Sequence, residues 1–221
     1  MKRIVLVFVI ILISIKIFSQ DYDIYGTKIY DPVISNETND LESVKNAKVI
    51  TYYGLDFSLL KFIKLQNVMD DDKMRKYLGG WISYYHKYLP PYNYLFKKLK
   101  FDNYLMDYYS VQNNIDSVAR NWIVASAKEV NINDISASIK KYDLEVSNGI
   151  GFVIHPVEFI ESKGMTKCYF TFFEINTRKI LWVSEIQGSG NGSGITQLYG
   201  RGMIVCTKNY IKNIYQKEIM K

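Results

Sequence analysis

A glycine-rich stretch near the end of the sequence has the composition of a loop that binds an anion. Residues 186–202 read IQGSGNGSGITQLYGRG. Four glycines alternate there with small polar residues: Gly188, Gly190, Gly192 and Gly194. A loop that leads into a helix can direct its backbone N–H groups at an anion, and Arg201 is near enough in the sequence to assist. We weigh an anion site at Gly190, Gly192, Gly194 and Arg201 against a flexible Gly/Ser connector.

The spacing of these glycines does not match the two common phosphate-binding motifs. Ser193 stands where G-x-G-x-x-G requires a third glycine after Gly188 and Gly190. The G-K-[ST] sequence of the Walker motif is absent. The loop is therefore a candidate for anion binding only through its position between a strand and a helix.

Asp56 is the carboxylate with the best position for a ligand or a reaction. It follows an apolar stretch and a glycine, at the end where α/β sheets bind ligands. The alternative is a turn or a helix cap before Phe57 and Ser58, since Asp is a preferred capping residue. Our candidate ligand-binding residues are Asp56, Gly190, Gly192, Gly194 and Arg201.

Motifs for metal binding and nucleophilic catalysis are missing. The chain has two histidines, His86 and His155, and two cysteines, Cys168 and Cys206, none at a metal-ligand spacing. No G-x-S-x-G nucleophile elbow occurs. We interpret His155, which lies in an apolar stretch, as a hydrogen-bonded core histidine rather than a catalytic base. We assign no catalytic residue, no metal and no cofactor.

Residues 84–100, YYHKYLPPYNYLFKKLK, mix tyrosine with lysine. Stacking rings combined with cations bind glycans or single-stranded nucleic acid. Helical spacing, however, places Tyr77, Tyr85 and Tyr88 on a buried face, so we favour core tyrosines with solvated lysines. A glycan site here would require exposed, coplanar rings.

The N-terminus, MKRIVLVFVIILISIKIFSQ, has the pattern of a secretory signal peptide over residues 1–20. The apolar run from Ile4 to Ile15 is shorter than the roughly 20 residues that span a bilayer. Endings in Ser-Gln resemble signals of some Gram-negative bacteria. The alternative is an uncleaved membrane anchor, because Lys16 interrupts the apolar run. We expect a periplasmic or secreted protein of a Gram-negative bacterium, with a peripheral position at the outer membrane as a further option.

Export changes the charge and the cysteine chemistry. Without the three basic residues of the signal the chain has 25 basic and 22 acidic residues, a net charge of +3. This small excess argues against a nucleic-acid partner, which needs a strongly basic domain or stripe. An exported compartment permits a Cys168–Cys206 disulfide, and two buried thiols are the alternative.

The elements that would position these residues fall into a first half rich in helices and a last third rich in strands. Residues 21–46 are polar and irregular, and we expect an extended segment. The expected elements of the first half are a strand at 47–54, a helix from Ser58 to Ile63, a helix at 70–89, a strand at 105–111, a helix at 115–130 and a short helix from Asp134 to Tyr142. The helix at 70–89 has the clearest 3.6-residue pattern.

The last third predicts a buried strand at 149–160, a hairpin of 167–175 and 179–186, and a final helix at 197–218. Pro156 cannot donate to a sheet, so we expect a bulge or an edge there. The order β-α-α-β-α-α-β-β-β-α predicts a single α/β domain over 47–221, with one mixed sheet and helices packed on it.

The end of the chain resembles the α/β domain of curli-secretion and penicillin-binding-protein-activator envelope lipoproteins. Five residues carry this similarity: Ile175, Asn176, Thr177, Ile180 and Trp182. Arg178 and Lys179 replace the Thr-Gly step of those proteins, and the lipobox cysteine is absent. The chain more closely resembles a family of uncharacterised exported bacterial α/β proteins through YYGLDFS (52–58) and TFFEINTRKILW (171–182). The resemblance implies an envelope location and a non-enzymatic role, and it transfers no catalytic residue.

We therefore expect an exported, non-enzymatic binding or adaptor module, with an envelope protein or a glycan as its partner. The alternative is a small-ligand-binding or hydrolytic enzyme that uses the end of the sheet near Asp56 together with the loop Gly188–Gly194.

Overall fold

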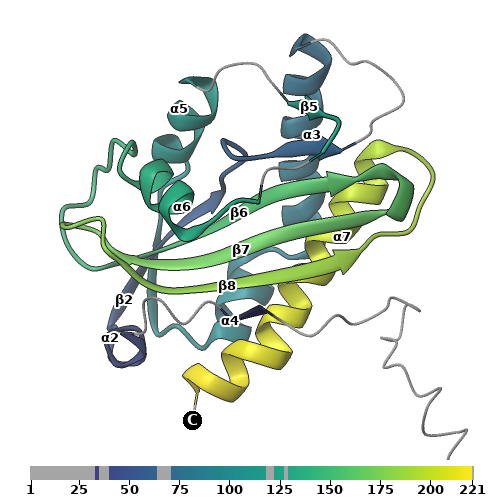
Figure 1. Cartoon of the computed structure of the whole chain (residues 1–221). Helices are drawn as coiled ribbons and strands as arrows, with labels where there is room; N and C mark the ends of the chain where they lie inside the picture. Colours follow the sequence, from purple (N-terminus) through teal and green to yellow (C-terminus); the bar gives the residue numbers. More distant parts are fainter. Residues whose placement is uncertain (1–32, 35–39, 64–70, 118–121, 127–128, 221) are drawn as a thin grey trace, which may run out of the picture.

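The computed structural model describes residues 33–34, 40–63, 71–117, 122–126 and 129–220. The expected signal peptide, 1–20, lies outside these residues. Helices cover both faces of a mixed sheet: in Figure 1, α5 and α6 lie in front of it, and α3, α4 and α7 lie behind it. The predicted α/β class is thus confirmed. Within the described part of the chain, no helix is both long enough and apolar enough to cross a membrane.

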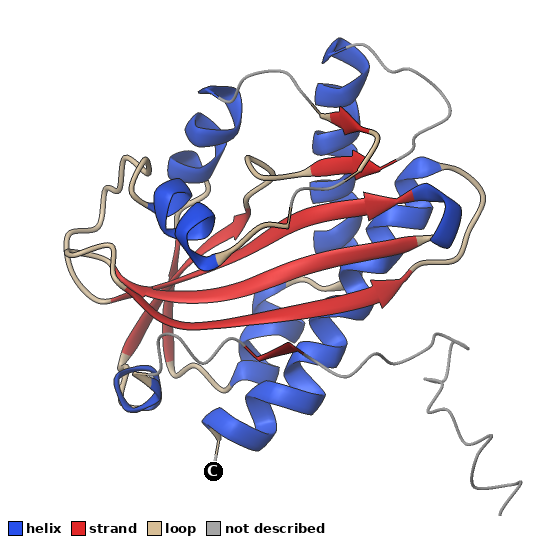
Figure 2. Ribbon diagram, in the orientation of Figure 1, coloured by secondary structure: helices blue, strands red, loops and turns tan. Residues whose placement is uncertain are grey.

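Eight strands among the described residues form one sheet, which Figure 2 shows in red. Its main path runs in the order β1 (Val33–Ile34), β8 (Ile180–Ser189), β7 (Met165–Glu174), β6 (Ile150–Ile160), β2 (Val49–Leu55) and β4 (Asn103–Met106). Strands β6, β7 and β8 form an antiparallel meander, whereas β2 is parallel to both β6 and β4. The hairpin predicted at 167–186 is therefore confirmed.

Strand β6 is the centre of the sheet because it pairs with two strands along one side. Its first half pairs with β2, and its last residues pair with β3 (Lys61–Ile63), which in turn pairs with β5 (Ile123–Val124). The register with β7 shifts between Pro156 and Glu158. This is the bulge expected where proline supplies no backbone donor.

The described residues include six α-helices and three helical segments of other types. Their bounds are α2 (Leu41–Lys45), α3 (Asp71–Tyr88), α4 (Phe96–Leu99), α5 (Tyr109–Ser117), α6 (Ile132–Ile139) and α7 (Ile195–Tyr210). Two π-helical segments, η1 (Pro91–Leu95) and η3 (Ile211–Ile219), precede α4 and continue α7, and a 3₁₀ turn, η2 (Glu161–Lys163), joins β6 to β7. The helices predicted at 70–89 and 197–218 are confirmed, as is the short helix before Tyr142.

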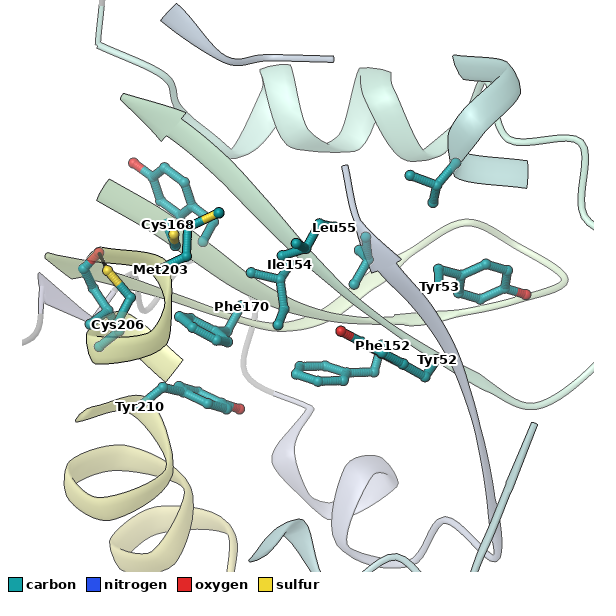
Figure 3. Packing of buried hydrophobic residues seen from close by; sticks show 14 of the residues in the cluster. Tyr52, Tyr53, Leu55, Phe152, Ile154, Cys168, Phe170, Met203, Cys206 and Tyr210 are labelled. Carbon is teal, nitrogen blue, oxygen red and sulfur yellow. Dashed lines mark hydrogen bonds between the residues drawn. The ribbon is translucent and has the colours of Figure 1, made fainter. Parts of the chain in front are cut away.

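The core behind the sheet is built largely from aromatic rings. Phe170 of β7 stacks on Tyr210 of α7 with ring centroids 4.2 Å apart (Figure 3). Phe152 of β6 stacks on Phe172 of β7 at 4.6 Å. Trp81 of α3 is fully buried against Phe159 of β6 at 5.2 Å. These contacts hold α3 and α7 against the sheet and so set how the two helices lie relative to each other.

The predicted order of elements differs from the structure in several places. Residues 58–63 form a turn and the strand β3, not a helix, because the backbone of Phe62 bonds to Trp122 at 2.7 Å and its ring packs on Trp81. The helix predicted at 115–130 begins earlier, at Tyr109, and ends at Ser117; residues 123–124 form β5 instead. The strand predicted at 105–111 is shortened accordingly, since β4 ends at Met106. Part of the segment expected to be extended, 41–45, is the helix α2.

Candidate functional site

Asp56 lies at the centre of a polar network in front of the sheet. It follows β2, and its backbone N–H donates to the Ile154 carbonyl at 2.8 Å, which ties it to β6. The side chain is fully buried. Its Oδ1 accepts a hydrogen bond from the backbone N–H of Ser58 at 2.8 Å, which is the turn expected from sequence. The carboxylate is therefore oriented by the chain that immediately follows it.

The second carboxylate oxygen of Asp56 accepts hydrogen bonds from the helical side. Tyr142 donates from its hydroxyl at 2.5 Å, Ser138 at 2.8 Å and Asn114 at 3.2 Å. Asn114 belongs to α5 and Ser138 to α6, while Tyr142 follows α6. The network thus joins β2 to the two helices that cover this face of the sheet.

His155 of β6 completes the network. Its Nε2 lies 3.4 Å from Asp56 Oδ2 and 3.2 Å from the Tyr142 hydroxyl, and its ring is fully buried. Burial by itself would raise the pKa of Asp56, but the hydrogen bonds and charge of His155, with the bonds from Tyr142 and Ser58, lower it to about 2. Burial raises the pKa of Tyr142 well above its usual range, and the charge of Asp56 raises it further. Asp56 is therefore an ionised acceptor and Tyr142 a neutral donor.

An aspartate, a histidine and serines are the components of a nucleophilic triad, but they are not arranged as one. The Ser138 hydroxyl bonds to Asp56 and that of Ser58 to Ser138, rather than to His155. His155 Nδ1 has no hydrogen-bond partner among the described residues. A triad needs the histidine between the carboxylate and the nucleophile. Asp56 and His155 are also closed to solvent, so no substrate reaches them in this conformation.

A pocket of about 310 Å³ lies behind the sheet, between α3 and α7, beside the glycine-rich loop. Its polar and aromatic lining is Tyr84, Tyr88, Ser189, Asn191, Arg201 and Lys208. Ile204 and Val205 of α7 supply the aliphatic part of the lining. The size is at the lower end of the range for small-molecule sites, roughly 300 to 1,000 Å³.

Arg201 connects the loop to both helices of the pocket. Its Nη1 donates to the backbone carbonyl and to the side-chain Oδ1 of Asn191, each at 2.9 Å. Its Nε donates to the Tyr84 hydroxyl at 3.3 Å. The structure thus brings Arg201 to the loop, as the sequence suggested, and adds Tyr84 of α3 to the same cluster.

The glycines of the loop allow close packing against α7. A Cβ atom at Gly190 would lie 1.8 Å from the Leu198 carbonyl oxygen, and the Gly190 N–H donates to the Gly164 carbonyl at 2.9 Å. Gly194, which precedes α7, has a φ of +94° that other residues rarely adopt. The loop is therefore held by the helix that follows it, and packing accounts for its glycines without a phosphate.

The expected site does not form as one unit. The partners of Asp56 come from α5 and α6 in front of the sheet, whereas Arg201 and the loop lie at the pocket between α3 and α7 behind it (Figure 1). Gly190, Gly192 and Gly194 belong to the same loop as Asn191, but none of these three glycines lines the pocket. Asp56 and the loop are therefore two separate features.

Five pocket residues were not predicted as members of one site: Tyr84, Tyr88, Ile204, Val205 and Lys208. Tyr88 was expected to be buried, yet 52% of its surface is exposed, while Tyr85 is fully buried as expected. The rings of Tyr84 and Tyr88 lie 4.7 Å apart at 43° and so are not coplanar. The spacing of Tyr84 and Tyr88, four residues apart, was the available signal that they share a face of α3.

The two cysteines are buried free thiols. Cys206 Sγ lies 3.4 Å from the Thr166 carbonyl oxygen. Burial raises the pKa of Cys168 well above its usual range, and a hydrogen bond with Cys206 raises it further. Over the residues that the structure describes, no group of three His, Cys, Asp or Glu side chains could hold a metal ion.

Comparisons with protein-family models, with curated proteins and with solved structures gave no match for this chain. The case for a function therefore depends on the two features above.

Proposed function

We propose that the protein is an exported, non-enzymatic binding module of the cell envelope, and that its ligand binds in the pocket between α3 and α7. The observation that carries the proposal is the fixed Arg201, which lines a pocket that also has aromatic and aliphatic walls. Ligand sites commonly combine apolar walls with a few oriented polar groups. The envelope location rests on the signal-like N-terminus and on the resemblance at 52–58 and 171–182.

The binding test uses the chain without residues 1–20 and a panel of soluble envelope components, including cell-wall glycan fragments. Each component is titrated while backbone amide resonances are recorded. A binder should shift the amides around Asn191 and Arg201 in wild type, and the shifts should be lost in Arg201→Met. Shifts elsewhere, or none with any component, would refute a ligand site in this pocket.

The location test is separate. The full chain, expressed in a Gram-negative host, should appear in the periplasm or the medium with a mass that has lost about 20 residues, as signal cleavage requires. A full-length protein in the cytoplasm would refute export, without bearing on the pocket.

A hydrolytic enzyme is the second candidate, favoured by the 3.4 Å contact between Asp56 and His155. It requires a conformation in which this buried pair opens to solvent. A turnover activity that survives purification and is abolished by Asp56→Asn and by His155→Gln, in variants that remain folded, would establish it over the binding module.

A further inference from the structure

The charges around the pocket between α3 and α7 have one sign. Arg201 and Lys208 are both in its lining, and the described lining includes no Asp or Glu. Lys87 of α3 adds a third positive charge close by, since its Nζ lies 5.7 Å from the centre of the Tyr88 ring. Such cations favour an anionic ligand, because hydrogen bonds between charged groups are stronger than those between neutral groups.

Arg201 is held in place for such an anion before it binds. Its Nε and Nη1 donate to Tyr84 and Asn191. The remaining amino group, Nη2, can donate to a ligand. A guanidinium that is already fixed loses little side-chain freedom on binding, which favours affinity.

The rest of the pocket suits a small ring with hydroxyl groups. Tyr88 is 52% exposed, and its ring is tilted by 43° against that of Tyr84, so a ligand would pack on the single ring of Tyr88 and not on a coplanar pair. Ile204 and Val205 add aliphatic surface. Ser189 and Asn191 offer hydrogen-bonding groups at the loop. A sugar ring has C–H faces that pack on aromatic rings and hydroxyl edges that hydrogen-bond. The volume of about 310 Å³ fits a ligand of one or two such rings better than a long chain.

We infer that the ligand of this pocket is an acidic sugar, a pyranose-type ring that bears one carboxylate or phosphate. The anionic group binds at Arg201, and the ring packs against Tyr88. This inference rests on the proposed function, in that it names the ligand class of the same pocket.

The test is calorimetric and NMR titration of the chain without residues 1–20 with five probes: glucuronic acid, glucose 6-phosphate, glucose, inorganic phosphate and AMP. At least one of the two acidic sugars should bind about tenfold more tightly than glucose and inorganic phosphate, a ratio equal to roughly 1.4 kcal/mol. The preference should shrink as salt is raised, since part of the pocket is open to solvent.

Variants separate the two parts of the ligand. Arg201→Met should remove the preference for the acidic sugar over glucose. Tyr88→Ala should weaken the binding of the acidic sugar but leave the salt dependence of that binding unchanged. Lys141→Met removes one exposed lysine outside the pocket lining and is the matched charge control. It should bind as wild type does.

Four results would overturn the inference. If glucose binds as tightly as glucuronic acid and glucose 6-phosphate, charge has no role in binding, although the pocket remains a ligand site. Inorganic phosphate that binds as tightly as glucose 6-phosphate would remove the role of the ring. AMP as the tightest probe would assign the pocket to nucleotides. If none of the five probes binds, the acidic sugar is excluded, and only the wider panel of envelope components decides whether the pocket binds a ligand.

Discussion

At the scale of single residues, Asp56 is an ionised carboxylate held in the interior by groups from four separate parts of the chain. A buried charge is tolerated only when it is paired and hydrogen-bonded. Removal of the carboxylate leaves its donors without an acceptor, whereas removal of one donor leaves the others. Loss of Asp56 should therefore destabilise the protein much more than loss of any single donor.

We predict that Asp56→Ala lowers the free energy of unfolding by about 3 to 5 kcal/mol, because it leaves several buried hydrogen-bond donors without an acceptor. Tyr142→Phe deletes one hydroxyl and should cost about 1 to 2 kcal/mol. Urea unfolding followed by circular dichroism measures both. A loss below about 1 kcal/mol for Asp56→Ala would mean that the network does not hold these elements together.

The same carboxylate predicts how stability depends on pH. The pKa of Asp56 is about 2 in the folded protein, below 3.8, the ordinary value for an aspartate, which we take for the unfolded chain. Because the unfolded chain binds the proton more readily, the contribution of Asp56 is complete above pH 4. It is lost as pH falls from about 4 towards 2 and amounts to roughly 2 kcal/mol. Asp56→Asn should flatten this part of the stability curve, and an unchanged slope would contradict the low pKa.

Cys168 should be unreactive in the folded protein, because burial keeps its pKa high and its thiol protonated. At pH 8, iodoacetamide should label Cys168 in urea but leave it unlabelled in buffer over the same time. Tryptic peptide mass spectrometry measures this. Rapid labelling of native Cys168 would show that α7 separates from the sheet.

The residue types and positions predicted part of this chemistry. The turn at Ser58 and the hydrogen-bonded core role of His155 follow from local sequence. The other partners of Asp56 lie far away along the chain, from Asn114 to His155. Their meeting depends on which helix covers which strand, and no spacing in the sequence carries that information.

At the scale of elements, the glycine loop is a packing joint between β8 and α7. We predict that Gly190→Ala destabilises the protein, because its Cβ would lie 1.8 Å from a backbone oxygen of α7. The matched control is Gly79→Ala in α3, where nothing lies within 4 Å of the added Cβ. It should stabilise the protein by up to about 1 kcal/mol through helix propensity. Thermal unfolding compares the two, and equal melting temperatures would contradict the tight joint.

Helix α3 and the meander β6–β8 were predictable because each has a long, regular pattern of apolar residues. In both cases the tertiary packing agrees with the structure that this local pattern favours. Residues 58–63 were not, since their apolar spacing fits a helix as well as a strand. These residues become a strand because β3 pairs with β5 and β6, which lie about 60 and 100 positions further along the chain. The same non-local pairing shortened the helix expected at 115–130.

At the scale of the whole molecule, the sheet separates the two candidate sites. The Asp56 network lies on the face covered by α5 and α6, and the pocket lies on the face covered by α3 and α7 (Figure 1). The sequence placed Asp56 and Arg201 in one hypothesis because each follows a strand. Only the strand order and the helix positions show that they lie on opposite faces. In our proposal, the Asp56 network stabilises one face of the sheet and the pocket on the other face binds the ligand.

One measurement tests this division directly. The amide resonances of the chain without residues 1–20 are recorded during titration with envelope components, in wild type, in Asp56→Asn and in Arg201→Met. The account predicts that ligand shifts centre on Asn191 and Arg201, survive Asp56→Asn in its folded form and vanish in Arg201→Met without loss of stability. Shifts that centre on Asp56 and His155, or that disappear only in Asp56→Asn, would contradict it.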